Sequence, residues 1–146
     1  MAIRNIVQLG DPILTKASRP VKNFDDRLAQ LLDDMRDTLK KADGAGLAAV
    51  QVGVLRRVCI VDAGGETLEL VNPEILKQEG EQVEEEGCLS LPGKQGKTRR
   101  PALVDIRAQD RAGKWHIHRG EGVKARAFCH EIDHLDGILF TQRVIN

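Results

Sequence analysis

The clearest pattern in the chain is a stripe of apolar residues with helical spacing in its first third. The apolar positions recur every three or four residues and would form one face of an amphipathic helix. They are Leu28, Leu31, Leu32, Met35, Leu39 and Ala42. Asn23 or Asp25 can cap the start, Lys40 and Lys41 suit the negative end, and Gly44 can end the helix. The pattern predicts a surface helix packed on the core.

Short apolar segments divided by turn residues follow this helix and are typical of strands. Gly64 and Gly65 separate one pair of segments, and the sequence DRAG separates another, as in β-hairpins. The expected strands are 56–63, 67–73, one segment on each side of Gly80 within 74–87, 101–110 and 114–120. A final helix is expected from Val123 to Asp136, ended by Gly137. This order of elements indicates an α+β fold with antiparallel strands, in one domain over 1–146.

Two segments before the strands lack a clear periodicity. Residues 3–21 are broken by Gly10-Asp11-Pro12 and by Pro20, which predicts an extended arm with a turn. The segment GAGLAAVQVG, from Gly44 to Gly53, consists mostly of small residues and is expected to be a flexible loop.

Composition and charge exclude several classes of function. Hydrophobic residues make up 41% and charged residues 30%, which is ordinary for a soluble globular protein. Lys plus Arg and Asp plus Glu both number 22, so no net basic field favours a nucleic acid or an anionic membrane. The start of the sequence lacks the apolar stretch of a signal peptide, and no apolar run approaches 18 residues. A cytoplasmic protein without a membrane or direct nucleic-acid site is expected.

The strongest chemical signal is the sequence HEIDH, residues 130–134, in the final helix. Residues four apart project from the same helical face, so His130 and His134 can reach one metal ion. Glu131 lies beside the first ligand and can take a proton from a water molecule that the ion activates. The spacing indicates a metal hydrolase; the alternative is a pair of structural histidines on a core helix.

A catalytic ion of this kind requires a third protein ligand. Asp136, downstream, points to another side of the helix, so the ligand must come from upstream. The candidates are His116, His118, the acidic run Glu84-Glu85-Glu86 and the cysteines Cys59, Cys88 and Cys129. An odd number of widely spaced cysteines argues against a disulfide framework and for reduced thiols or a metal ligand.

The three cysteines and the two upstream histidines differ in how well they suit the role of third metal ligand. Cys88 follows EEG in a segment typical of a loop, and a thiolate is a strong ligand for soft or borderline ions. Cys59 lies within a strand and is expected to be a core residue. His116 and His118 share one face of an expected strand. We expect Trp115 and Ile117 to face inward and both histidines to face solvent, away from any metal.

Three motifs together resemble the peptide deformylases. They are GAGLAAVQ (Gly44 to Gln51), EGCLS (Glu86 to Ser90) and HEIDH (His130 to His134), in that order. The opening VQLGDPILTKASRPV and the segment around Arg100-Pro101 also resemble the family, so the likeness covers essentially the whole chain. The resemblance implies antiparallel sheets around a central helix that carries HEIDH, and removal of the formyl group from the formyl-methionine of new polypeptides.

The resemblance also implies a role for each motif. The metal ligands would be Cys88, His130 and His134, with Glu131 as the acid/base. The side-chain amide of Gln51 and the backbone N–H of Leu89 would contact the formyl oxygen, and Gly46 would contact the peptide backbone. The implied cofactor is one divalent ion, Fe²⁺ natively, with Zn²⁺, Ni²⁺ or Co²⁺ possible after purification. N-formylmethionyl nascent peptides would be the substrates, with a transient encounter at the ribosome of a bacterial cytoplasm.

Some features depart from the family pattern or remain open. Cys129 stands directly before His130, where the family often has glutamine, and we expect it to pack away from the ligand face. Many members continue into a longer C-terminal helix. Arg100 can pair with Glu86 or with Asp133, and Phe128 and Ile132 are expected as walls of a methionine pocket.

Two other hypotheses compete with a deformylase. A general metallo-peptidase would also use the HEIDH motif, although such enzymes rarely take an upstream thiolate as third ligand. A non-catalytic metal-binding interaction module would be expected to close its site with a fourth ligand. Replacing Glu131 while keeping the metal would separate a catalytic site from a structural one.

Overall fold

A computed structural model describes residues 2–62 and 64–145 of the chain. Its helical elements are η1 (Pro12–Thr15), α1 (Asp26–Ala42), η2 (Ala49–Val52), α2 (Val123–Leu135) and η3 (Phe140–Gln142). Its strands are β1 (Gly46–Ala48), β2 (Val58–Asp62), β3 (Thr67–Glu79), β4 (Gln82–Glu86), β5 (Gly96–Arg100), β6 (Leu103–Gln109) and β7 (Trp115–Glu121). In the described residues, no helix combines the length and apolar character needed to cross a membrane.

The first helix forms where the apolar stripe predicts it. Asp25 caps α1 by accepting a hydrogen bond from the Leu28 N–H, so Asn23 is not the cap. At the other end the left-handed residue is Asp43, with φ of 54°, rather than the expected Gly44. Five of the six stripe residues are buried against β1 and β2, which confirms a surface helix with one core-facing side.

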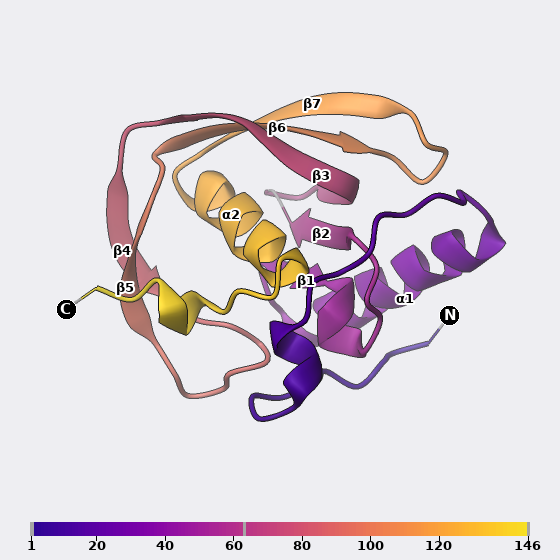
Figure 1. Ribbon diagram of the computed structural model, residues 1–146, viewed down its shortest axis with the longest axis horizontal. Coiled ribbons are helices and arrows are strands. Elements are labelled where there is room, and N and C mark those ends of the chain that lie inside the picture. Colours follow the sequence, from indigo (N-terminus) through magenta and orange to yellow (C-terminus); the bar gives the residue numbers. More distant parts are fainter. Residues whose placement is uncertain (1, 63, 146) are drawn as a thin grey trace.

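Five strands form one antiparallel sheet in the order β1-β2-β3-β6-β7, and β4 pairs with β5 in a second, two-stranded sheet. Figure 1 shows α2 in the middle of the molecule, with the large sheet curving over it and the β4–β5 pair at one side. The apolar face of α2 packs on the sheet around Phe128 and Leu135, which are fully buried. The prediction of an α+β fold with antiparallel sheets around a central helix is confirmed.

The two sheets are successive parts of one long bent ribbon. β3 pairs with β6, and beyond the bend β4 pairs with β5, so Glu79 lies opposite Leu103 and Gln82 opposite Arg100. Gly80, with φ of 68°, and Pro101 lie at the bend, where neither strand continues its ladder. This bend turns the β4–β5 end of the ribbon around α2, and the loop after β4 therefore reaches the helix.

The strands differ from the expected set in three ways. Residues 67–79 form one strand rather than two, although Pro73 and the positive φ of Asn72 interrupt its pairing with β6. β5 was not expected. The small-residue segment is ordered and buried: it forms β1 and η2 instead of a flexible loop.

The orientation expected for β7 was wrong. His118 lies opposite the buried Ile106 and its ring is 6.4 Å from that of Phe128, so it lies on the inner face. Trp115 and Ile117 are on the outer face and are exposed. The inner face has no room for a large residue near the end of β7, because even a Cβ at Gly120 would lie 2.9 Å from the Phe128 ring.

The segment after α2 closes the other side of the helix. Val144 forms a bridge with Thr98 of β5, and the Ile145 N–H donates to the Lys97 carbonyl, so the chain adds to the edge of the two-stranded sheet. Phe140 stacks on the ring of His130 at 6.0 Å between centroids. The helix is therefore enclosed by the large sheet, the β4–β5 pair and this segment.

Candidate metal centre

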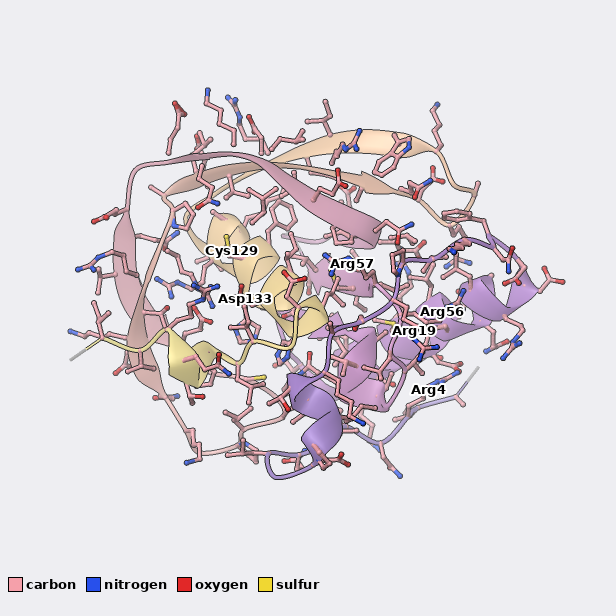
Figure 2. The ribbon with its side chains drawn as sticks, viewed as in Figure 1. Arg4, Arg19, Arg56, Arg57, Cys129 and Asp133 are labelled. Atoms are coloured by element: carbon pink, nitrogen blue, oxygen red, sulfur yellow. The ribbon has the colours of Figure 1, made fainter. Side chains whose placement is uncertain are left out.

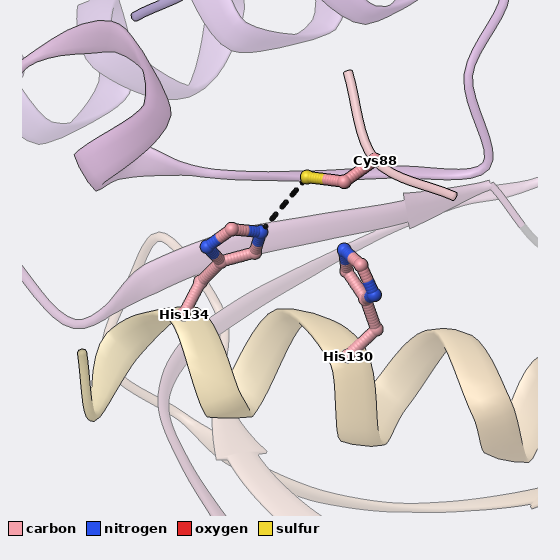
Figure 3. Close-up of side chains that lie close together, drawn as sticks. All are labelled: Cys88, His130 and His134. Carbon is pink, nitrogen blue, oxygen red and sulfur yellow. Dashed lines mark hydrogen bonds between the residues drawn. The ribbon is translucent and has the colours of Figure 1, made fainter. Parts of the chain in front are cut away.

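Cys88, His130 and His134 meet where the loop after β4 crosses α2. One ligand atom from each of the three lies within 4.8 Å of the other two. The Cys88 Sγ is 3.2 Å from the His134 Nε2, and Figure 3 shows both rings turned from the helix toward the sulfur. A thiolate with two imidazoles is a donor set that suits Zn²⁺ or Fe²⁺, so the residues fit a metal ion.

The ligand atoms are selected by the neighbours of each histidine. The His130 Nδ1 is 2.5 Å from a carboxylate oxygen of Glu86, so its Nε2 remains available for an ion. The His134 Nε2 faces Cys88, while its Nδ1 is buried without a partner in the described part of the chain. Burial lowers the pKa of His134 to about 3, so this ring is neutral at pH 7, as a metal ligand must be.

The protonation of His130 depends on the charges around it. Burial lowers its pKa, but the negative charge of Glu131 and the hydrogen bonds that His130 donates to Cys88 and Glu86 outweigh burial and raise the pKa to about 10. A metal ion must therefore displace a proton from His130. This displacement couples the affinity for the ion to pH.

Glu131 lies beside the ligands in an enclosed position. Its side chain is 4% exposed, and its Oε1 has no hydrogen-bond partner among the described residues. Burial raises the pKa of Glu131 to about 7, although the charge of His130 acts in the opposite direction. A carboxyl group that both accepts and releases protons near neutral pH suits a general acid/base.

Glu86 is the centre of a buried network of charges behind the ligands. Besides the His130 ring, its carboxylate accepts hydrogen bonds from Arg100, Arg126 and Thr98. Although burial raises the pKa of Glu86, the hydrogen bonds from His130 and Arg100 hold it well below its usual range. The network joins the last residue of β4 to β5 and to α2, and it orients His130.

Arg100 extends this network to the next turn of the helix. Its guanidinium contacts Glu86 at 2.7 Å and Asp133 at 2.6 Å, so it makes both of the pairs between which the sequence could not choose. Asp133 also accepts two hydrogen bonds from Arg143 in the closing segment. Figure 2 shows Asp133 and Cys129 on neighbouring turns of α2. Cys129 is buried in the core, and burial raises its pKa to about 11, which agrees with a packing role.

Gln51 is held with its amide group facing the metal ligands. Its Oε1 accepts a hydrogen bond from the Ala48 N–H, so the NH₂ group must point the other way. There it donates to the Ser90 hydroxyl at 3.1 Å and lies 3.5 Å from the Cys88 sulfur. Leu89, between Cys88 and Ser90, is half-buried and borders the same cavity as the ligands.

A cavity of about 260 Å³ opens beside the ligands, between β1, the loop after β4 and α2. The residues of α2 that line it lie one or two turns before His130 and are Val123, Arg126 and Ala127. Phe128 and Ile132 do not: both lie in the core between helix and sheet, so the expected pocket walls were wrong. The helical face that carries the histidines also supplies the wall.

The structure brings the predicted site residues together, and His116 and His118 lie away from the converging ligand atoms, as expected. Glu131, Gln51 and Leu89 surround the ligands, and Gly46 lies at the cavity edge beside Glu131. His116 instead pairs with Asp110 at 2.8 Å on the surface, and His118 packs on Phe128. Arg126 and Thr98 were not predicted, because their contacts with Glu86 have no local sequence signature.

Replacing Glu86 with Gln should destabilise the fold, because Arg100 and Arg126 would be left buried without their counter-charge. Breaking a buried ion pair on one side costs about 3–5 kcal/mol. Urea unfolding of the metal-free protein would measure the loss. Glu84→Gln is the matched control, since Glu84 is exposed two residues earlier in the same strand, and its effect should stay within about 0.5 kcal/mol. Equal stability of the two variants would contradict the role given to the network.

Comparisons with known proteins agree with this geometry. Residues 3–146 match the polypeptide deformylase family. A peptide deformylase of Alkaliphilus metalliredigens is 53% identical over 145 residues, which cover 99% of both chains. The crystal structure of peptide deformylase from Thermotoga maritima superposes with a TM-score of 0.96 at 37% identity and covers 99% of each chain. A peptide deformylase structure from Legionella pneumophila gives a TM-score of 0.94 at 43% identity, over 98% of this chain and 86% of that one.

Proposed function

Because the chain belongs to the peptide deformylase family, we propose that Cys88, His130 and His134 hold its catalytic metal ion and that Glu131 is its acid/base. The enzyme removes the N-formyl group from newly made polypeptides. One observation carries the assignment of residues: a cysteine sulfur and two imidazoles converge within 4.8 Å beside a buried glutamate and an open cavity.

The residues around the ligands divide the work of amide hydrolysis. When bound, the ion supplies Lewis-acid polarisation and a nucleophile at neutral pH. Glu131 takes the proton of the attacking water and returns it to the nitrogen of the leaving methionine. The Gln51 amide and the Leu89 backbone N–H donate to the formyl oxygen as negative charge develops on it. The position of the Gln51 NH₂ group, 3.5 Å from the Cys88 sulfur, supports this role.

We propose that the substrate peptide binds in the cavity and along the edge of the large sheet. β1 is the first strand of that sheet and pairs on one side with β2, and its other edge could pair with an extended peptide at Gly46, because the Ala48 N–H is already bonded to Gln51. Gly46, the first residue of β1, lies at the cavity and would contact the peptide backbone. The methionine side chain would enter the cavity of about 260 Å³ along Val123 and Ala127.

The test of this proposal is formate release from formyl-Met-Ala-Ser, with metal content measured on the same sample. Turnover should rise in proportion to the bound ion and vanish when a chelator removes it. The general metallo-peptidase would cleave internal or unformylated peptides, and a non-catalytic module would bind the ion without releasing formate. Formate release that does not depend on the metal would contradict the proposed site.

The resident ion and the setting are part of the same proposal. The family requires a metal, and we propose Fe²⁺ as the ion of the native enzyme, with Zn²⁺, Ni²⁺ or Co²⁺ as replacements. The substrate is a nascent chain, so we place the enzyme in a bacterial cytoplasm, in transient encounter with the ribosome. Metal analysis of protein purified without oxygen would identify the ion.

Replacing Gln51 with Leu should lower kcat while KM changes little, because the lost amide acts on charge that develops in the transition state. Loss of one such donor costs about 10²-fold or more in kcat. Steady-state kinetics on the metal-loaded variant would measure both constants. A change in KM alone would reassign Gln51 to substrate binding.

A further inference from the structure

The Glu131 side chain lies directly against a glycine, Gly46. An alanine Cβ built at Gly46 would lie 2.6 Å from the Glu131 Oε2, 2.9 Å from its Cγ and 3.0 Å from its Cδ. Real Cβ atoms essentially never lie within 3.0 Å of another heavy atom, so the end of the glutamate occupies the space that a side chain at position 46 would need. The backbone of β1 is therefore one wall of the Glu131 site.

The backbone conformation does not explain why position 46 is glycine. Gly46 does not have a positive φ, and it pairs with Val61 in a regular antiparallel register. Most L residues adopt such a conformation without strain. Close approach of another group is the remaining reason for the missing side chain, and that group is Glu131.

Among the described residues, no hydrogen bond to the Glu131 Oε1 offers an alternative support for the glutamate. The Glu131 Oε1 is buried without a hydrogen-bond partner in the described part of the chain, whereas the ligand His130 is held by Glu86. A general acid/base must lie within hydrogen-bond reach of the proton that it transfers. The orientation of this carboxylate therefore depends on the shape of its enclosure.

We propose that Gly46 is a positioning residue for Glu131, in addition to its backbone contact with the substrate. Because Gly46 has no side chain, the Glu131 carboxylate can lie close to β1, and this position determines its distance from the reacting formyl group. The inference rests on the catalytic role of Glu131 proposed above. A backbone contact with the peptide would survive in a Gly46→Ala variant, whereas the position of the carboxylate would not, so the two roles of Gly46 can be separated.

Gly46→Ala in the metal-loaded enzyme should lower kcat for formyl-Met-Ala-Ser by about 10- to 100-fold, the effect of a misplacement approaching 1 Å. KM and metal content should stay near their wild-type values. The loss should shrink in a Glu131→Asp background, because the shorter side chain withdraws from the new methyl group. In a Glu131→Ala background, Gly46→Ala should change the residual kcat by less than about twofold.

Gly44→Ala is the matched control, because it introduces the same methyl group two residues earlier at the same cavity. Its Cβ would meet the side chains of Leu89 at 2.8 Å and Leu39 at 3.0 Å rather than Glu131. Whatever loss it causes should therefore persist unchanged in the Glu131→Ala background. The two glycines are thus distinguished by their coupling to Glu131.

Three results would overturn the inference. A rise in KM without a change in kcat, or an equal loss of kcat with and without Glu131, would mean that Gly46 acts only on the substrate. If Gly46→Ala failed to fold, the double variant with Glu131→Ala should recover folding, and its failure would show that the defect is independent of Glu131. Near-normal turnover of Glu131→Ala itself would instead refute the proposed mechanism.

Discussion

Replacing Glu131 with alanine is expected to lower kcat for formate release by about 10²- to 10⁴-fold, the contribution of a positioned acid/base. The fold and the metal content should be unchanged, because Glu131 is not among the three side chains whose ligand atoms converge. The substitution also removes the cost of burying a carboxyl group whose Oε1 has no hydrogen-bond partner in the described residues. Thermal stability should therefore not fall with activity. Formate release and metal content should be measured on the same preparation.

Two comparisons make the Glu131 result specific. Glu131→Gln keeps the size of the side chain and removes the proton-accepting charge, so it should lose activity to a similar extent. Glu84→Ala, at an exposed position of β4, should keep full turnover. Near wild-type turnover by the metal-loaded Glu131→Ala protein would assign the proton transfer to another group.

Replacing Cys88 with serine should strongly weaken metal binding. Loss of a residue that only supports a ligand lowers metal affinity by roughly 10- to 100-fold, and loss of a ligand itself should lower it further. A serine hydroxyl is a harder and weaker ligand than a thiolate for Fe²⁺ or Zn²⁺. Competition with a chromophoric chelator would measure the affinity. With Co²⁺ as a probe, the absorption band from thiolate to metal should disappear in the variant.

Cys59 and Cys129 provide matched controls for the Cys88 experiment. Both are buried in the core, outside the group of converging ligand atoms. Cys59→Ser and Cys129→Ser should therefore keep the metal stoichiometry and the Co²⁺ band, and any cost should appear as lower stability. Full metal content in Cys88→Ser together with its loss in Cys129→Ser would mean that the ligand assignment is wrong.

Elements with a regular apolar period could be predicted from the sequence. The stripe from Leu28 to Leu39 is buried as expected, and the final helix begins at Val123 as expected. In both, packing on the sheet follows the period of 3.6 residues, so the sequence contains the signal. The position of His130 and His134 on one face follows from the same period.

β5 was missed because its buried positions are polar. Thr98 and Arg100 are buried while Lys97 and Arg99 are exposed, so the strand alternates in burial without alternating in hydrophobicity. Its inward side chains are stabilised by Glu86, which lies in another strand, and no local pattern can show that pairing. The sequence therefore predicted the three side chains that converge and a pair made by Arg100, but not the contacts of Arg126 and Thr98 with Glu86.

The pocket wall could have been predicted, whereas the contact between Gly46 and Glu131 could not. Val123, Arg126 and Ala127 precede His130 at helical spacing, so they belong to its face, and Phe128 and Ile132 belong to others. Gly46 and Glu131 are far apart in the chain. Their contact results from the close approach of β1 to α2, which depends on the packing of the whole sheet.

Because the ribbon bends around α2, a metal ion bound at the proposed site would also affect folding. Cys88 and His134 are 46 residues apart in sequence and belong to different substructures, and none of the described cysteines forms a disulfide. An ion bound by both residues would be a reversible cross-link. By binding the native state it stabilises that state by mass action, and it lowers the conformational entropy of the unfolded chain only if it remains bound to both residues in that chain. Chelation should therefore loosen the β4–β5 pair before the rest of the molecule, and amide exchange in those strands would report the loss.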